Sequence, residues 1–72
     1  MTKEVFLKKL GKNITRLRES ANLSQTDLAF KLDKDRQSMN RVEKGRTNPT
    51  IYFLTQIAQE LNVSLTELLT FD

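Results

Sequence analysis

The sequence predicts an all-α domain of five short helices, with a helix-turn-helix at the second and third. Apolar residues recur every three or four positions in separate stretches, which is the spacing of helices that pack one face on a core. Capping and turn residues separate these stretches and set the ends of the helices. Only about three residues, 33 to 35, separate the second and third helices, a spacing suited to two short helices packed at a steep angle.

The composition fits one small globular domain and excludes several kinds of site. The 72 residues allow a single domain, residues 1–72, with a thin core, and 38% hydrophobic against 29% charged residues suit a folded chain. The absence of Cys and His excludes disulfides, zinc fingers, thiol nucleophiles and imidazole bases. No nucleophile has a base at a recognisable spacing, and no glycine-rich phosphate loop occurs, so we expect neither an enzyme nor a cofactor.

The sequence contains no segment that predicts membrane insertion or secretion. No apolar run approaches the roughly 18 residues of a membrane span, and no apolar h-region adjoins the N-terminus. We therefore expect a cytoplasmic protein. Because the chain ends at Asp72, we also expect no second domain that senses a ligand.

Charge is distributed unevenly along the chain. All twelve Lys and Arg residues lie before Asn48, whereas the only charges after it are those of Glu60, Glu67 and Asp72. A segregated basic half can concentrate positive potential against a phosphate backbone, and it leaves the acidic half free to face away or to meet a partner. The net charge of +3 is modest, so the distribution is more informative than the total.

The first helix is expected from a stripe of apolar residues, with Lys8, Lys9, Lys12, Arg16 and Glu19 off the stripe. Asn22 follows the last residue of the stripe, and Asn readily adopts the left-handed conformation that ends a helix. The residues of the stripe are Leu7, Leu10, Ile14, Leu17 and Ala21.

The second and third helices are short and well marked at their ends. Ser24 is expected to cap a helix over about residues 25–32, with the acidic Asp27 near the positive end of the helix dipole. This helix stops at Asp33. Asp35 is expected to cap the third helix, which ends at Lys44-Gly45 with glycine just beyond the last turn. The residues expected to face the core are Leu28, Ala29, Leu32, Met39 and Val42.

The fourth and fifth helices follow a polar loop at residues 46–49. Thr50 is expected to cap the fourth helix and Asn62 to close it. Ser64 and Glu67 match a capping box at the start of a short fifth helix, about residues 65–70. The apolar stripe of the fourth helix contains Ile51, Leu54, Ile57, Ala58 and Leu61.

The face of the third helix opposite Met39 and Val42 is polar and carries no acidic residue. Arg can pair with guanine through O6 and N7, and Gln or Asn can pair with adenine through N6 and N7. These are the side chains that read a DNA major groove, although they are also common on a helix face that only meets solvent. The residues on this arc are Arg36, Gln37, Asn40, Arg41 and Lys44.

From Gly11 to Leu69 the chain resembles the lambda-repressor-like family, which includes Cro, phage repressors and XRE-type helix-turn-helix domains. The order and spacing of several weak motifs across the five helices carry the resemblance. The matching segments are Gly11-Lys12-Asn13-Ile14, Leu17-Arg18, Leu23-Ser24-Gln25, Leu28-Ala29, Arg41-Val42-Glu43-Lys44-Gly45, Asn48-Pro49, Ile57-Ala58-Gln59-Glu60-Leu61-Asn62-Val63-Ser64 and Leu68-Leu69. Family members usually place Gly where Asn22, Asp33 and Asn62 stand, and Asn and Asp tolerate the same positive φ.

The resemblance implies a transcriptional regulator that binds double-stranded DNA as a homodimer, with the third helix in the major groove of a two-fold-symmetric operator. It also implies a salt bridge between Arg18 and Glu43, for which we expect partial burial. By position, the base-reading residues are Arg36, Gln37, Asn40 and Arg41. The residues that match DNA-backbone contacts are Gln25, Lys44, Arg46 and Asn48.

The end of the chain carries more apolar side chains than so short a tail needs. Leu65, Leu69 and Phe71 are therefore candidates for the dimer contact, although Phe71 could equally fold back and cover the thin core. Two alternatives to an autonomous regulator stay open. One is an antitoxin that binds a protein toxin and regulates its own operon, and the other is a protein-interaction module with no role in DNA binding.

Overall fold

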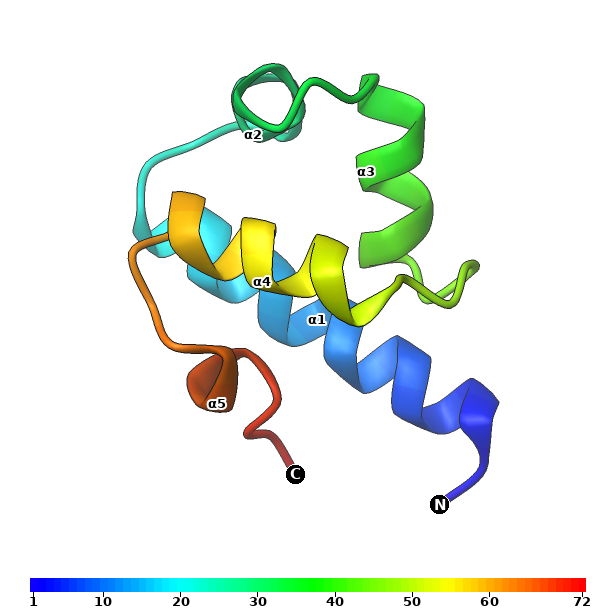
Figure 1. Cartoon of the computed structure of the whole chain (residues 1–72). Helices are drawn as coiled ribbons and strands as arrows, with labels where there is room; N and C mark the ends of the chain where they lie inside the picture. Colours follow the sequence, from blue (N-terminus) through cyan, green and yellow to red (C-terminus); the bar gives the residue numbers. More distant parts are fainter.

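The computed structural model describes residues 1–72 and contains five α-helices and no strands, so the predicted all-α fold is confirmed (Figure 1). α2 packs against α3 and α4, while α1 packs against α3 and α5. Figure 1 shows α2 and α3 together on one side of α1 and α4, with α5 on the other side. The helices are α1 (Lys3–Ser20), α2 (Gln25–Lys31), α3 (Arg36–Glu43), α4 (Ile51–Glu60) and α5 (Leu65–Leu68).

Each of the caps predicted from the sequence forms. The side-chain oxygens of Ser24, Asp35, Thr50 and Ser64 each accept a hydrogen bond from the backbone N–H three residues ahead, at 2.7 to 3.0 Å. Glu67 completes the predicted capping box, and Asp27 completes a second one at Ser24. These bonds satisfy backbone donors that a helix cannot pair internally.

The helix ends also follow the predicted turn chemistry. Asn22, Asp33 and Asn62 have φ values of 59°, 56° and 58°, and Gly45 has a φ of 72°. Two helices are shorter than predicted, since α2 ends at Lys31 and α5 ends at Leu68. The residue after each, Leu32 or Leu69, serves as the C-cap instead of a further helical residue.

One apolar core joins all five helices. Leu10, Ile14, Leu28, Met39 and Ile57 are at most 2% exposed. Each helix therefore buries one face, as the spacing of its apolar residues predicts. The complete set is Leu7, Leu10, Ile14, Leu28, Ala29, Leu32, Met39, Val42, Leu54, Ile57, Ala58, Leu61 and Leu68.

Two residues of the predicted stripes, Ala21 and Ile51, are exposed, and a third, Leu17, is only partly buried against the core. Ala21 is exposed because it is the C-cap of α1, where the chain already turns away. Ile51 is 64% exposed because it stands in the first turn of α4. At 100° per residue, Ile51 also projects about 70° from the centre of the arc that the buried residues of α4 share. The periodicity alone did not distinguish these two positions.

Two glycines allow α1 to lie close to the end of α3. A Cβ atom on Gly11 would overlap the backbone carbonyl of Glu43. A Cβ atom on Gly45 would lie 2.8 Å from the backbone of Lys8. No side chain fits between the two segments at either point, so the close approach of α1 to α3 depends on glycine at both. None of the five helices has both the length and the apolar character that a membrane crossing requires.

Candidate nucleic-acid interface

α3 buries Met39 and Val42 and presents its opposite face to solvent. Arg36, Gln37 and Arg41 are exposed, and Asn40 is half-buried. These four residues, predicted to read bases, line one shallow hollow on the outer face of α3, which we call the α3 hollow. The structure therefore brings the four candidates together on a single surface.

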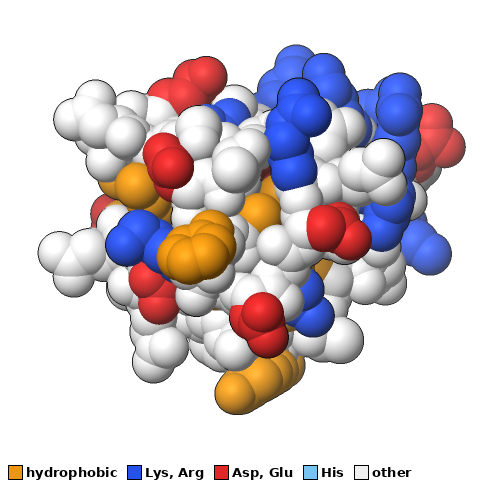
Figure 2. Space-filling model, turned by 90° about the horizontal axis from the view of Figure 1, so that it is seen from above, with side chains coloured by type: hydrophobic (Ala, Val, Ile, Leu, Met, Phe, Trp, Pro, Cys, Tyr) orange, Lys and Arg blue, Asp and Glu red, His pale blue; other side chains and the backbone are white.

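The surface around α3 is basic. Figure 2, which views the molecule from the side of α2 and α3, shows Lys and Arg side chains gathered at its upper right, on the side where α3 lies. One acidic side chain lies at the right edge beside this cluster, and the others are scattered over the rest of the same view. Positive charge gathered in this way attracts a polyanion to one face of the protein.

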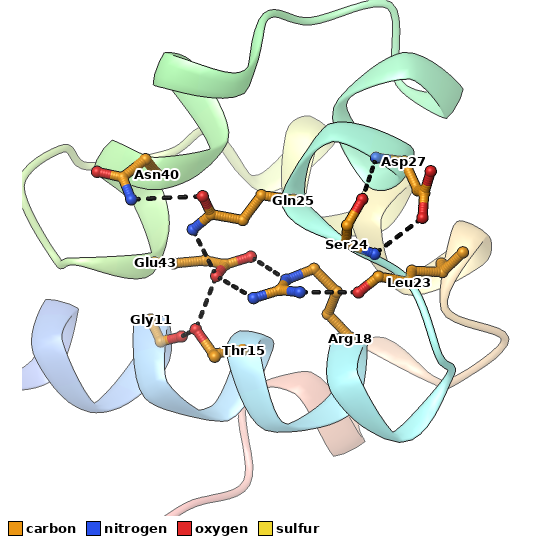
Figure 3. Close-up of polar contacts among 9 residues, drawn as sticks. All are labelled: Gly11, Thr15, Arg18, Leu23, Ser24, Gln25, Asp27, Asn40 and Glu43. Atoms are coloured by element: carbon orange, nitrogen blue, oxygen red, sulfur yellow. Dashed lines mark hydrogen bonds and ion pairs between the residues drawn. The ribbon is translucent and has the colours of Figure 1, made fainter.

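Arg18 and Glu43 form an ion pair that joins α1 to α3. The Nε atom of Arg18 lies 2.8 Å from Oε2 of Glu43, and the Nη2 atom of Arg18 donates to Oε1 at 3.0 Å (Figure 3). The side chains are only 9% and 3% exposed, so the pair is more deeply buried than the partial burial expected from the sequence. The hydrogen bonds to Glu43 favour the charged guanidinium and raise the pKa of Arg18.

Glu43 is the centre of a larger polar network, which we call the Glu43 network. Its Oε1 atom also accepts hydrogen bonds from the hydroxyl of Thr15 at 2.9 Å and from the amide of Gln25 at 3.0 Å. Arg18 donates in addition to the carbonyl of Leu23 at 2.7 Å, which connects α1 to the turn before α2 (Figure 3). No buried side-chain nitrogen or oxygen lacks a hydrogen-bond partner. The network therefore fixes three elements relative to one another.

The network reaches the α3 hollow through Gln25. The side-chain oxygen of Gln25 accepts a hydrogen bond from the amide of Asn40 at 3.4 Å, and the side-chain amide of Gln25 donates to Glu43 (Figure 3). Gln25, predicted to contact a DNA backbone, is thus half-buried and also orients Asn40. Neither Thr15 nor this second role of Gln25 was predicted from the sequence. No local motif could have indicated them, because the contacts to Glu43 span 28 and 18 positions.

The four residues predicted to contact the DNA backbone do not form one cluster. Gln25 and Lys44 line a groove between α1 and the helix-turn-helix. Arg46 and Asn48 instead line a hollow beside the N-terminal part of α1. The two sets therefore line different hollows, and Asn48 also lines a third one together with Ser38 and Arg41 of α3. Lys8, Lys12 and Arg16 of α1 share the groove with Gln25 and Lys44, and their spacing of four residues was visible in the sequence.

The three candidates for a dimer contact pack against the core of this chain. Leu65, Leu69 and Phe71 are partly buried. The ring of Phe71 lies with its centroid 5.4 Å from that of Phe6 on α1. Of the two alternatives for Phe71, the single chain adopts the one in which the tail covers the core. A contact between two copies of the chain stays a prediction.

Nowhere does the structure gather three carboxylates that could hold an ion. The α3 hollow consists of amide and guanidinium groups, which are suited to phosphate oxygens and base edges.

Comparison with known proteins identifies the family. Residues 14–68 match the helix-turn-helix family. The chain is 38% identical over 63 residues to an uncharacterised HTH-type transcriptional regulator, y4dJ, of Sinorhizobium fredii, covering 88% of this chain and 82% of the relative. The restriction-modification controller protein C.AhdI of Aeromonas hydrophila has a similar structure, with a TM-score of 0.83 and 34% identity over 86% of this chain and 94% of that one.

A third similar protein was solved on DNA. It is the restriction-modification controller protein C.Esp1396I, whose tetramer was determined in complex with its natural 35 base-pair operator. Its TM-score is 0.74 with 30% identity, and the match covers 90% of this chain and 96% of that one. With five helices, an exposed basic α3 and these matches, the chain belongs to the XRE-type helix-turn-helix family of DNA-binding transcriptional regulators.

Proposed function

We propose that the chain binds a two-fold-symmetric operator as a homodimer, with α3 in the major groove, and thereby regulates transcription. The observation that carries the proposal is the α3 hollow, where Arg36, Gln37, Asn40 and Arg41 lie together on an exposed basic face. An α-helix with its side chains is about 10 to 12 Å across, which is close to the width of the B-DNA major groove.

The four side chains of the α3 hollow divide into free and tethered ones, and Arg41 is among the tethered, since it donates to the hydroxyl of Ser38 at 3.4 Å. Arg36 and Gln37 project from the first turn without a hydrogen bond to another side chain and can adapt to a base edge. Asn40 is held by Gln25 and therefore presents its amide in one preferred direction. A tethered amide loses less conformational entropy when it binds, which favours its use for one defined base.

The direct test is selection of bound sites from random duplex DNA, followed by binding measurements over a range of salt concentrations. We expect a two-fold-symmetric consensus whose half-sites are about one helical turn apart. The affinity should fall steeply with salt, because each phosphate contact releases counterions. A protein that enriches no sequence and shows no salt-dependent binding to any duplex would instead be an interaction module.

The dimer is tested separately, by sedimentation of the free protein over a range of concentrations. We propose that Leu65 and Leu69 contribute to the contact, since both are only partly covered by their own chain. Phe71→Ala should lower stability, because it removes the ring packed on Phe6. If the wild-type chain stays monomeric at high concentration and also binds operators as a monomer, the assignment of this interface is wrong.

A further inference from the structure

The groove between α1 and the helix-turn-helix is a second basic surface, and we call it the α1 groove. No hydrophobic side chain lines it. On the α1 side its basic residues are spaced four apart, so they form one row along the helix. Its principal lining residues are Lys8, Lys12 and Arg16 from α1, Gln25 from α2, and Asn40 and Lys44 from the end of the helix-turn-helix.

The positive charge of the α1 groove is not neutralised within the chain. The ion pair of the structure is Arg18–Glu43, so Lys8, Lys12 and Lys44 have no acidic partner. Two acidic residues line the groove. Glu43 is occupied by the Glu43 network, and Glu19 lies more than one helical turn beyond Lys12. The part of the groove between Lys8 and Lys44 therefore presents uncompensated charge to solvent.

The α1 groove is continuous with the α3 hollow. Asn40 lines both the α1 groove and the α3 hollow. Gln25, which accepts a hydrogen bond from Asn40, also lines the α1 groove. The tight contacts at Gly11 and Gly45 hold the α1 row beside the end of α3 and place the backbone of Lys8 against Gly45. A duplex bound to the α3 hollow would consequently pass close to the α1 row.

We propose that Lys8 and Lys12 of α1 bind phosphates of the same duplex that α3 reads, so that the α1 groove holds one DNA backbone alongside the major groove. The inference rests on the proposed function and extends it to a surface outside the helix-turn-helix. Lys8 and Lys12 lie about 6 Å apart along the helix axis. Each DNA strand carries a charge about every 3.4 Å of duplex axis, so the two ammonium groups can reach different phosphates. Lysine binds phosphate as a point charge and needs no base-specific geometry.

The test compares two double variants that lower the net charge equally, from +3 to +1. Lys8→Gln/Lys12→Gln removes the charges of the α1 groove. Lys9→Gln/Lys31→Gln removes two charges outside it, since neither residue lines the α1 groove and Lys31 lies in the last turn of α2. Affinity for the selected operator and for a random duplex is measured for each variant from about 50 to 200 mM salt. Thermal unfolding confirms that both variants are folded.

The groove variant should show a slope of log affinity against log salt that is shallower by about two, for operator and random duplex alike. The control variant should keep a slope within about half a unit of wild type. In phosphate-ethylation interference, the groove variant alone should lose some of the phosphate positions at which ethylation blocks binding by the wild-type chain. Equal slopes in the two variants, with all interference positions retained, would overturn the inference while leaving operator binding by the wild-type chain intact. A wild-type chain that binds no duplex would overturn the proposed function and this inference with it.

Discussion

The two sides of α3 are built in opposite ways. On the inner side, Glu43 is 6% exposed and both of its carboxylate oxygens accept hydrogen bonds, within a network that joins α1, α2 and α3. On the outer side, Arg36 and Gln37 are exposed and make no hydrogen bond to another side chain. The inner side therefore determines where α3 stands, and the outer side is free to vary in what it recognises. Substitutions on the two sides should separate stability from recognition.

The largest effect is expected on the inner side, from Glu43→Ala. This change leaves the guanidinium of Arg18 buried without its acidic partner. Breaking a buried pair from one side costs about 3 to 5 kcal/mol in the free energy of unfolding, which urea titration measures. Glu19→Ala is the control, since Glu19 is an exposed acid on the same helix as Arg18 and should change stability by less than about 0.5 kcal/mol. A loss below about 1 kcal/mol for Glu43→Ala would mean that the pair behaves as a surface pair.

The second largest effect is expected from Gly11→Ala, which tests the contact of α1 with α3. In an unobstructed helix interior, Gly→Ala stabilises by about 1 kcal/mol. Here the added methyl group would overlap the backbone of Glu43, so Gly11→Ala should instead destabilise by about 1 to 3 kcal/mol. The sign of the change in the free energy of unfolding, measured by urea titration, distinguishes these two outcomes. A stabilised variant would show that α1 and α3 have room to separate and that the inner side is less tightly packed than the structure shows.

On the outer side, Gln37→Ala should leave stability unchanged and alter recognition. A base-reading side chain provides discrimination of about 1 to 3 kcal/mol at one position, so the preference at one operator base pair should relax. Lys44→Ala is the matched comparison, because it should weaken binding to all sequences alike and lower the salt slope by about one. Competition binding with a set of single-base operator variants measures the base preference, and binding over a range of salt concentrations measures the slope. If Gln37→Ala and Asn40→Ala leave the ranking of those variants unchanged, α3 does not read the sequence.

The smallest effect concerns the capping carboxylates of the helix-turn-helix. Backbone N–H groups donate to Asp27 and Asp35, and these bonds lower the pKa of both carboxyl groups. Their stabilisation is therefore present above the ordinary aspartate pKa of about 3.9 and is lost as the pH falls through the lowered folded values.

Asp27→Asn and Asp35→Asn keep a capping oxygen but cannot titrate, so each should reduce the loss of stability on acidification. Urea unfolding at a series of acidic pH values measures this. Asp33→Asn is the control, because the carboxylate of Asp33 accepts no capping hydrogen bond and the residue keeps its positive φ as Asn. An acid dependence unchanged in all three variants would contradict the role of the capping carboxylates.

Local features of this chain were readable from the sequence. The caps at Ser24, Asp35, Thr50 and Ser64 were predicted correctly, since a cap depends on residues only three positions apart. The left-handed turn at Asn22 follows equally from the chemistry of one residue. The spacing of apolar residues likewise predicted most of the core, because helical periodicity fixes which side chains share a face.

Tertiary structure decided the features that depend on distant residues. Ile51 lies on a predicted apolar stripe yet is exposed, because burial depends on which helices reach the first turn of α4. The bonds from Thr15 and Gln25 to Glu43, and the position of Lys8 beside Gly45, join segments that are 18 to 37 positions apart. Periodicity states which face of a helix is polar, but only the packing of α1 on α3 determines what that face meets. The residues that hold α3 in place, and the basic groove beside it, therefore became visible only in the folded chain.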